Sequence, residues 1–177
     1  KFKIIYLSTL NFKVMLKKFL HKYSDAGILF IRIGIGIAFV FVYGIMKIEG
    51  GPEMWQMVGS AMSNIKINFG HVFWGFLASA SEFFGGILIL LGLFTRIAAA
   101  FLAFTMLMAF VTHLSMLDPW HIAMHPMEVL GVFMGLIFIG SGKYSLDNIL
   151  FKINKEIFLH KSKTLTFNAR NLTTIHF

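Results

Sequence analysis

The sequence contains no cysteine. Disulfide bonds, thiolate catalysis, iron–sulfur clusters and cysteine-based zinc sites are therefore excluded for this chain. Any redox chemistry would have to use a bound cofactor or a bound substrate.

Charged residues are also scarce. They make up 14% of the 177 residues, whereas soluble domains carry roughly a quarter. Hydrophobic residues make up 57%, and the mean hydropathy is +0.76. Because so little polar surface remains to coat a water-soluble domain, the composition predicts a membrane protein.

Acidic residues are the scarcer charged type, with 8 Asp and Glu against 16 Lys and Arg, which gives a net charge of +8. Six of the basic residues precede residue 27 and six follow residue 141. Two terminal clusters do not form the basic patch with interleaved aromatics that binds nucleic acid, so no nucleic-acid partner is expected. They indicate instead that both ends stay on the cytoplasmic side of a membrane.

Four apolar stretches are each close to the roughly 20 residues that a helix needs to cross a bilayer. The connections at 92–96 and 118–125 are short, so consecutive spans should be antiparallel neighbours. The sequence thus predicts an all-α, polytopic membrane protein: an antiparallel bundle of four transmembrane helices within residues 25–142, with N-in and C-in topology in a bacterial cytoplasmic membrane. The spans are expected at about 26–46, 72–94, 97–117 and 126–141.

The flanking segments are predicted to be interfacial amphipathic helices. Residues 1–24 are basic and place Met15, Leu16, Phe19, Leu20 and Tyr23 on one face, and residues 1–14 are expected to lie upstream of the true start. Residues 143–177 are expected to form a cytoplasmic amphipathic helix capped by Ser145, followed by a polar tail. In the first loop, a short helix is expected from Pro52 to Met62.

Charged side chains within the spans need an explanation, because each costs about 2.5–3.5 kcal/mol at mid-depth. Glu82 shares its face of the second span with small residues, which indicates that it points into the bundle. Polar or small residues form similar stripes on the other spans: Arg32, Gly36, Phe39, Tyr43 and Lys47 on the first, His113 above Ala109 and Met106 on the third, and Glu128, Gly131 and Gly135 on the fourth.

These stripes predict an outward-facing polar pocket lined by Tyr43, Lys47, Glu82, His113 and Glu128. In it, Glu82, His113 and Glu128 are candidates for proton transfer, and Tyr43, Lys47, Glu82 and His113 for binding a substrate such as a quinone. Arg32 is expected to form a structural ion pair. Structural alternatives stay open for each residue. Lys47 would be an interfacial anchor, Glu128 a carboxylate favoured by the first turn of its helix, Glu82 a protonated carboxyl hydrogen-bonded to a neighbouring helix, and Arg32 a snorkelling side chain.

His121, His125 and Glu128 are four and three residues apart and would share a helical face, a spacing that could hold a metal ion. His113 could supply a fourth ligand. Pro126 is expected to break the helix between these residues, so no metal site is predicted.

Three segments together resemble the DoxX family of bacterial four-helix membrane proteins, over about residues 25–150. They are Glu82-Phe83-Phe84-Gly85-Gly86, Leu90-Leu91-Gly92-Leu93-Phe94-Thr95-Arg96 and Gly140-Ser141-Gly142-Lys143-Tyr144-Ser145-Leu146-Asp147. The resemblance implies a bundle in the cytoplasmic membrane, and members are linked to thiosulfate:quinone oxidoreduction and oxidant-defence complexes. The family often carries His-Gly-x-x-Lys at the end of the first span, where this chain has Tyr43-Gly44-Ile45-Met46-Lys47.

Three functional hypotheses follow. The leading one is a quinone-interacting subunit of a membrane oxidoreductase, because quinone oxygens accept hydrogen bonds from donors such as Lys47, Tyr43 and His113. The second is a non-catalytic partner or assembly subunit of a larger complex, or a homo-oligomer. The third is a small-solute carrier, for which four helices leave little room unless the protein oligomerises.

Overall fold

The computed structural model describes the backbone of residues 2–173 and the side chains of residues 12, 14, 15 and 23–161. Within this part of the chain all regular structure is helical. In chain order the elements are α1 (Phe2–Ala38), the π-helix η1 (Phe39–Gly44), α2 (Ile45–Glu49), α3 (Gly51–Gly59), the 3-10 helix η2 (Ser60–Ile65), α4 (His71–Leu91), α5 (Thr95–Ser115), α6 (Trp120–Ile139) and α7 (Leu146–Thr173).

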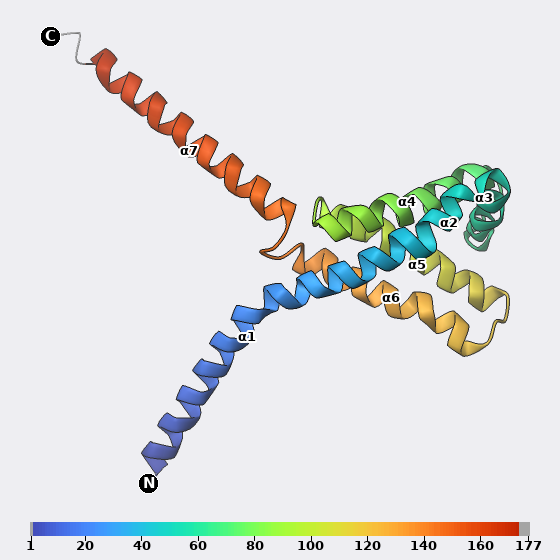
Figure 1. Cartoon of the computed structure of the whole chain (residues 1–177), viewed down its shortest axis with the longest axis horizontal. Coiled ribbons are helices and arrows are strands. Elements are labelled where there is room, and N and C mark those ends of the chain that lie inside the picture. The colour runs from blue at the N-terminus through green and yellow to red at the C-terminus, as the bar shows by residue number, and fades with distance from the viewer. Residues whose placement is uncertain (1, 174–177) are drawn as a thin grey trace.

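Four segments are long and apolar enough to cross a membrane: Tyr23–Glu49, His71–Leu91, Thr95–Ser115 and Trp120–Ile139. They pack side by side as an all-α bundle (Figure 1). Large apolar side chains point away from the bundle, including Phe30 at 74% and Phe138 at 75% exposure. Such a surface fits contact with lipid tails, so the predicted fold class is confirmed, and the chain is a multi-pass membrane protein.

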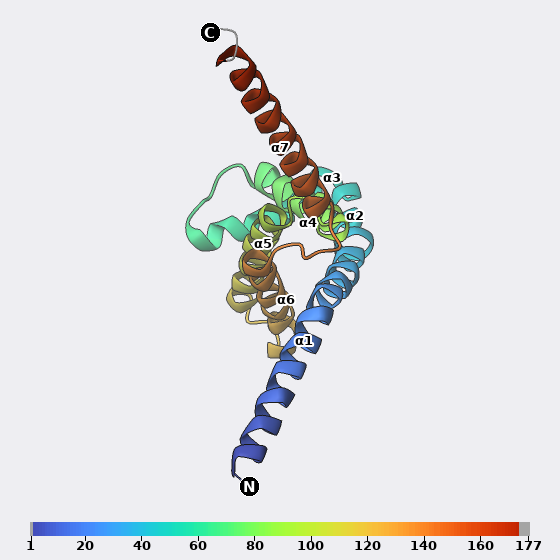
Figure 2. The same ribbon diagram turned by 90° about the vertical axis from the view of Figure 1, so that its left-hand side faces the viewer.

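The bundle has two distinct ends. At one end α3 lies across the spans, and we call it the α3 end; at the other, α7 and the N-terminal part of α1 leave the bundle, and we call it the α7 end (Figure 1). Viewed along the bundle, α7 and the start of α1 extend in opposite directions (Figure 2).

The N-terminal helix differs from the prediction in one respect. Instead of a separate interfacial helix before the first span, α1 runs without a break from Phe2 to Ala38. No proline or glycine interrupts residues 2–26, so nothing in the sequence ends a helix there. Of the predicted apolar face, Leu16, Phe19 and Leu20 lie outside the described side chains.

The fourth span also begins earlier than expected, at Trp120 instead of near Pro126. Pro126 lies inside α6, where its missing N–H removes a single helical hydrogen bond. Because this position is only in the second turn of the helix, the loss does not stop the helix from forming. The short helix expected in the first loop is confirmed as α3, although it ends at Gly59 and continues as η2.

The core between the spans is narrow and built partly from small residues. Ala98, Ala99 and Ala103 of α5 are buried against Ile89 and Phe133, which are both fully buried. Small side chains allow membrane helices to approach closely, and that approach supplies the dispersion contacts which replace the hydrophobic effect inside a bilayer. The spans are thereby held close enough for polar side chains of different helices to meet.

Candidate functional site

Lys47 and Glu82 form an ion pair between the first and second spans. The Lys47 Nζ lies 2.6 Å from both carboxylate oxygens of Glu82. Glu82 is 1% exposed and Lys47 is 22% exposed. The carboxylate is therefore sealed inside the bundle, while part of the Lys47 side chain reaches the surface.

The small residues around Glu82 explain why the two spans come so near. A Cβ atom on Gly44 would lie 2.6 Å from the Phe83 Cα, and one on Gly86 would lie 3.1 Å from the Val40 backbone nitrogen. The predicted inward face of α4 is confirmed, since Gly75, Ser79, Glu82, Gly85 and Gly86 are all buried. A larger residue at Gly44 would push the first span away from α4 and pull Lys47 from Glu82.

The first span contains a π-helical turn directly before Lys47. This turn, η1, spans Phe39–Gly44 and interrupts the α-helix for six residues. Turns of this kind occur mostly as local insertions, often at functional sites. The wider turn suits the four-residue spacing of Phe39, Tyr43 and Lys47, which all lie on the side of the helix that faces the bundle.

Tyr43 meets the fourth span through His125. The Tyr43 hydroxyl lies 3.4 Å from the His125 Nε2, and the ring centroids are 5.9 Å apart. One turn deeper, Phe39 packs edge-on against Phe133 with centroids 5.0 Å apart. Tyr43 and Lys47 are one helical turn apart, so the two polar pairs are neighbours. We call Tyr43, Lys47, Glu82 and His125 the polar cluster.

Trp55 of α3 covers the Lys47 side of this cluster. Its indole Nε1 donates a hydrogen bond of 2.9 Å to the Lys47 carbonyl oxygen, and its ring packs edge-on against Phe76. The helix α3 can pack directly on α4 because Gly75 of α4 has no Cβ. A Cβ at this position would overlap the backbone of Trp55. Trp55 therefore ties the loop helix to the end of the first span.

His113 and Glu128, predicted to line the same pocket, lie elsewhere. The His113 Nδ1 pairs with the Asp118 carboxylate at 2.7 Å, and both side chains are about one-third exposed. Glu128 and His121 are exposed on α6. Among the residues whose side chains the structure describes, no three His, Asp or Glu side chains are grouped to hold a metal ion. The expected five-residue pocket is thus replaced by a cluster with His125 as its fourth member.

Arg32 is 1% exposed and has partners that differ from the ion pair expected for it. Its four hydrogen bonds, of 2.8–3.1 Å, go to the backbone carbonyl oxygens of Ile89, Leu90, Ser141 and Tyr144. The guanidinium thus donates hydrogen bonds to two carbonyl oxygens in the last turn of α4, where carbonyls run short of helical N–H partners. It also joins α4 to the segment that follows α6.

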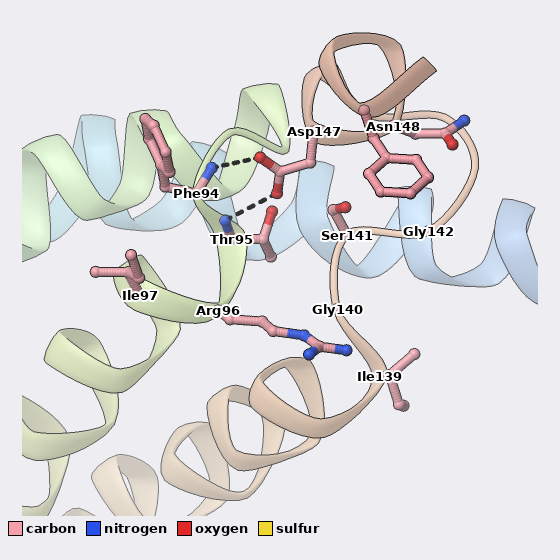
Figure 3. Close-up of a pocket in the computed structure, with 11 residues that line it drawn as sticks. Phe94, Thr95, Arg96, Ile97, Ile139, Gly140, Ser141, Gly142, Asp147 and Asn148 are labelled. Atoms are coloured by element: carbon pink, nitrogen blue, oxygen red, sulfur yellow. Dashed lines mark hydrogen bonds between the residues drawn. The ribbon is translucent and has the colours of Figure 1, made fainter. Parts of the chain in front are cut away.

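The segments from 90 to 96 and from 140 to 147 contact each other at the α7 end. The Asp147 carboxylate accepts hydrogen bonds from the backbone N–H groups of Phe94 and Thr95, at 2.8 and 3.1 Å (Figure 3). The Asp147 N–H in turn donates to the Gly92 carbonyl at 2.9 Å. Asp147 therefore caps the start of α5 from another helix and joins the two segments.

Sequence reasoning missed some of these roles. From the sequence, His125 is only a weak metal-ligand candidate in the link after the third span, and neither Asp147 nor Trp55 is predicted to line the pocket. A signal for Asp147 was available, because it follows the Ser145 cap on a helix in which no other acidic residue occupies the first turn. Ser145 itself caps α7 as predicted, accepting a hydrogen bond from the Asn148 N–H.

Comparison with protein families gives one match, to the DoxX family model, over residues 27–114. The matched segment covers the first three spans, including the residues that hold Lys47 against Glu82. Comparisons with curated proteins and with solved structures found no match. Residues 27–114 therefore match the DoxX family, as the three sequence segments suggested, and the four apolar helices are consistent with that match.

Proposed function

We propose that this protein is a quinone-interacting subunit of a membrane oxidoreductase, and that the polar cluster is its quinone site. The observation that carries the proposal is the sheltered Lys47–Glu82 ion pair, with N···O distances of 2.6 Å, one helical turn from the Tyr43–His125 contact. Intramembrane ionisable groups are expensive, and such groups usually serve a function.

The chemistry of the cluster suits a quinone. A quinone has two carbonyl oxygens that accept hydrogen bonds, and the Tyr43 hydroxyl, the His125 ring and the Lys47 ammonium are all donors. Reduction of a quinone to a quinol takes two electrons and two protons. Glu82, linked to the surface through Lys47, would pass protons inward, while the electrons would come from a separate redox subunit, a partner the chain is proposed to bind.

The apolar surroundings of the polar cluster also fit a quinone. Next to the cluster, Phe39 and Phe133 are buried and form the aromatic contact between the first and fourth spans. A bound quinone ring would replace part of the Phe39–Phe133 contact and stack on these two aromatic rings. Its isoprenoid tail would lie along the lipid-facing side of the spans. The excess of basic residues at both ends supports N-in, C-in topology in a bacterial inner membrane, which would place the cluster toward the outer leaflet.

A short-chain quinone titrated into the detergent-solubilised protein tests the proposal. Trp55 contacts Lys47, so its fluorescence should be quenched on binding, and Trp74→Phe with Trp120→Phe leaves Trp55 as the reporter. We expect Glu82→Gln and Tyr43→Phe to weaken binding roughly tenfold, as loss of a hydrogen bond to a charged or polar partner implies. Lys66→Gln, on the exposed loop, is the matched control. Equal quenching curves for all variants would reject the quinone site.

A second function, a non-catalytic partner or assembly subunit, is favoured by one observation on α6. Glu128 is exposed there, and added Cβ atoms on Gly131 and Gly135 would meet nothing within 4 Å. A lipid-facing carboxylate beside a Gly-xxx-Gly pair fits a contact with another membrane helix. Purification in mild detergent distinguishes the two functions. A protein that co-purifies in a fixed ratio with the wild type and is lost from Gly131→Leu would favour the partner function, provided that Glu82→Gln leaves quinone binding unaltered.

A further inference from the structure

Glu128 lies on the lipid-facing side of α6, near the middle of the fourth span. It follows Trp120, the first of the 20 residues of this span, by eight residues, which places it about 12 Å along the helix at about 1.5 Å per residue. Its side chain is exposed and makes no hydrogen bond or ion pair with any residue that the structure describes. A carboxyl group at this depth is costly when only lipid surrounds it, so a polar partner from outside the chain would stabilise it.

His125 supplies a complementary group on the same helix. It lies three residues before Glu128 and is also exposed. Its Nε2 lies 3.4 Å from the Tyr43 hydroxyl, whereas its Nδ1 has no partner among the described residues. An imidazole nitrogen and a carboxyl group can share a hydrogen bond whichever of the two holds the proton. Within one chain, however, Glu128 and His125 do not meet.

A second copy of this chain presents the same acid and the same base. In a two-fold symmetric pair every contact occurs twice, because residue i of one copy meets residue j of the other and the reverse also holds. Two copies with the same orientation in the membrane have parallel α6 helices, so Glu128 lies within one helical turn of His125 of the partner subunit. Both acids and both bases are then paired. A different protein would have to bring both groups in the same register.

The surface beside Glu128 allows the two helices to approach. Gly131 and Gly135 follow it by one and two helical turns, and a Cβ added to either would meet nothing within 4 Å. The buried residues Pro126 and Phe133 lie on the side of α6 that faces the bundle. No described helix therefore covers this side, and no bulky side chain holds a second α6 away from Glu128.

We propose that the protein forms a two-fold symmetric dimer through α6, in which Glu128 of each copy is hydrogen-bonded to His125 of the partner subunit. Because His125 also contacts Tyr43, each polar cluster gains a carboxyl group from the other copy. The dimer specifies the partner of the α6 surface and needs no quinone chemistry.

Energy transfer between labelled copies tests the dimer in a bilayer. The chain has no cysteine, so Lys152→Cys on exposed α7 gives a single labelling site. Donor-labelled and acceptor-labelled protein is reconstituted together in phosphatidylcholine vesicles at decreasing protein-to-lipid ratios. We expect transfer that fits a dimer, and a roughly tenfold weaker association in Glu128→Leu, which loses both symmetric hydrogen bonds. Glu128→Gln keeps a hydrogen-bonding amide and should weaken association less.

Met134→Leu, another lipid-facing change on α6, is the matched control and should leave the association unchanged. Because Glu128 is exposed, Glu128→Leu should retain the wild-type circular dichroism spectrum, which separates a lost dimer from a lost fold.

Disulfide formation locates the interface. Under mild oxidation Met124→Cys, four residues before Glu128 on the same side of α6, should link two copies, whereas Phe104→Cys on the lipid-facing side of α5 should not. A monomer at every protein-to-lipid ratio, equal association of wild type and Glu128→Leu, or linkage through Phe104→Cys in place of Met124→Cys would overturn the proposal. Absence of quinone binding would change none of these results, so the two proposals fail separately.

Discussion

Removing one member of the Lys47–Glu82 pair should destabilise the protein, and the two single variants should do so unequally. In Lys47→Met the Glu82 carboxylate, 1% exposed, loses its partner and has no route to water. In Glu82→Gln the Lys47 ammonium can extend toward the α3 end, because its side chain is already 22% exposed. The lysine variant should therefore be the less stable of the two.

The magnitudes follow from this geometry. Breaking a buried ion pair by removing one partner costs about 3–5 kcal/mol. Because Lys47 is partly exposed, solvent screens the pair in part, and Lys47→Met should cost about 3 kcal/mol, the lower end of that range. Glu82→Gln retains a hydrogen-bonding side chain and should cost about 1–2 kcal/mol. Because the double variant leaves no buried charge, it should be no less stable than Lys47→Met, which gives a coupling energy of at least about 1–2 kcal/mol.

Unfolding in mixed micelles, followed by far-UV circular dichroism as the proportion of denaturing detergent rises, measures these differences. Lys152→Met on exposed α7 is the control and should change stability by less than about 0.5 kcal/mol. The reasoning is refuted if Glu82→Gln is the more damaging single change, or if the coupling is below about 0.5 kcal/mol, the error of simple additivity.

Three further predictions concern the α7 end. Gly92→Ala should destabilise by more than about 1 kcal/mol, because φ is +68° and the new Cβ would overlap the Arg32 guanidinium, whereas Gly34→Ala, with open space around it, should be neutral or slightly stabilising in the same unfolding assay. Arg32→Lys should lower the melting temperature, since an ammonium group cannot reach four carbonyl oxygens in the geometry of the guanidinium fork, and an unchanged melting temperature would contradict that role. Asp147→Ala should weaken the start of α5 by about 1 kcal/mol and speed amide hydrogen exchange at Phe94 and Thr95, and equal exchange rates in variant and wild type would show that the cap is dispensable.

The spans and the inward face of α4 could be predicted from the sequence, because both depend on residue type at a regular spacing. Twenty apolar residues need a bilayer, and Glu82 among glycines at helical spacing needs a protein interior. The stripe of Arg32, Phe39, Tyr43 and Lys47 was predicted for the same reason. The structure places all four residues toward the bundle.

The partners of these residues were harder to predict. Arg32 binds carbonyl oxygens, and every residue carries a carbonyl, so no side-chain pattern marks them. The pairing of Tyr43 with His125 depends on the start of α6, which is predicted at about Pro126 because a proline disfavours helix in the residues before it. With α6 beginning at Trp120, His125 becomes part of the span and faces Tyr43.

His113 is predicted to line the pocket from its stripe on the third span and from its depth in the membrane. Depth along a helix does not fix the direction in which a side chain points, and Asp118, in the link after α5, provides a closer partner. No residue pattern in the sequence predicts the π-helical turn at Phe39–Gly44, whose last residue, Gly44, packs tightly on Phe83.

The most direct test of the account measures whether Lys47 and Glu82 touch in a lipid bilayer. Solid-state NMR on protein labelled with ¹⁵N in lysine side chains and ¹³C in glutamate carboxylates detects dipolar coupling between Nζ and the carboxylate carbon. The 2.6 Å N···O distances predict a strong coupling that disappears in both Glu82→Gln and Lys47→Met. Coupling that survives both substitutions, or is absent from the wild-type protein, would contradict a polar cluster inside the bundle.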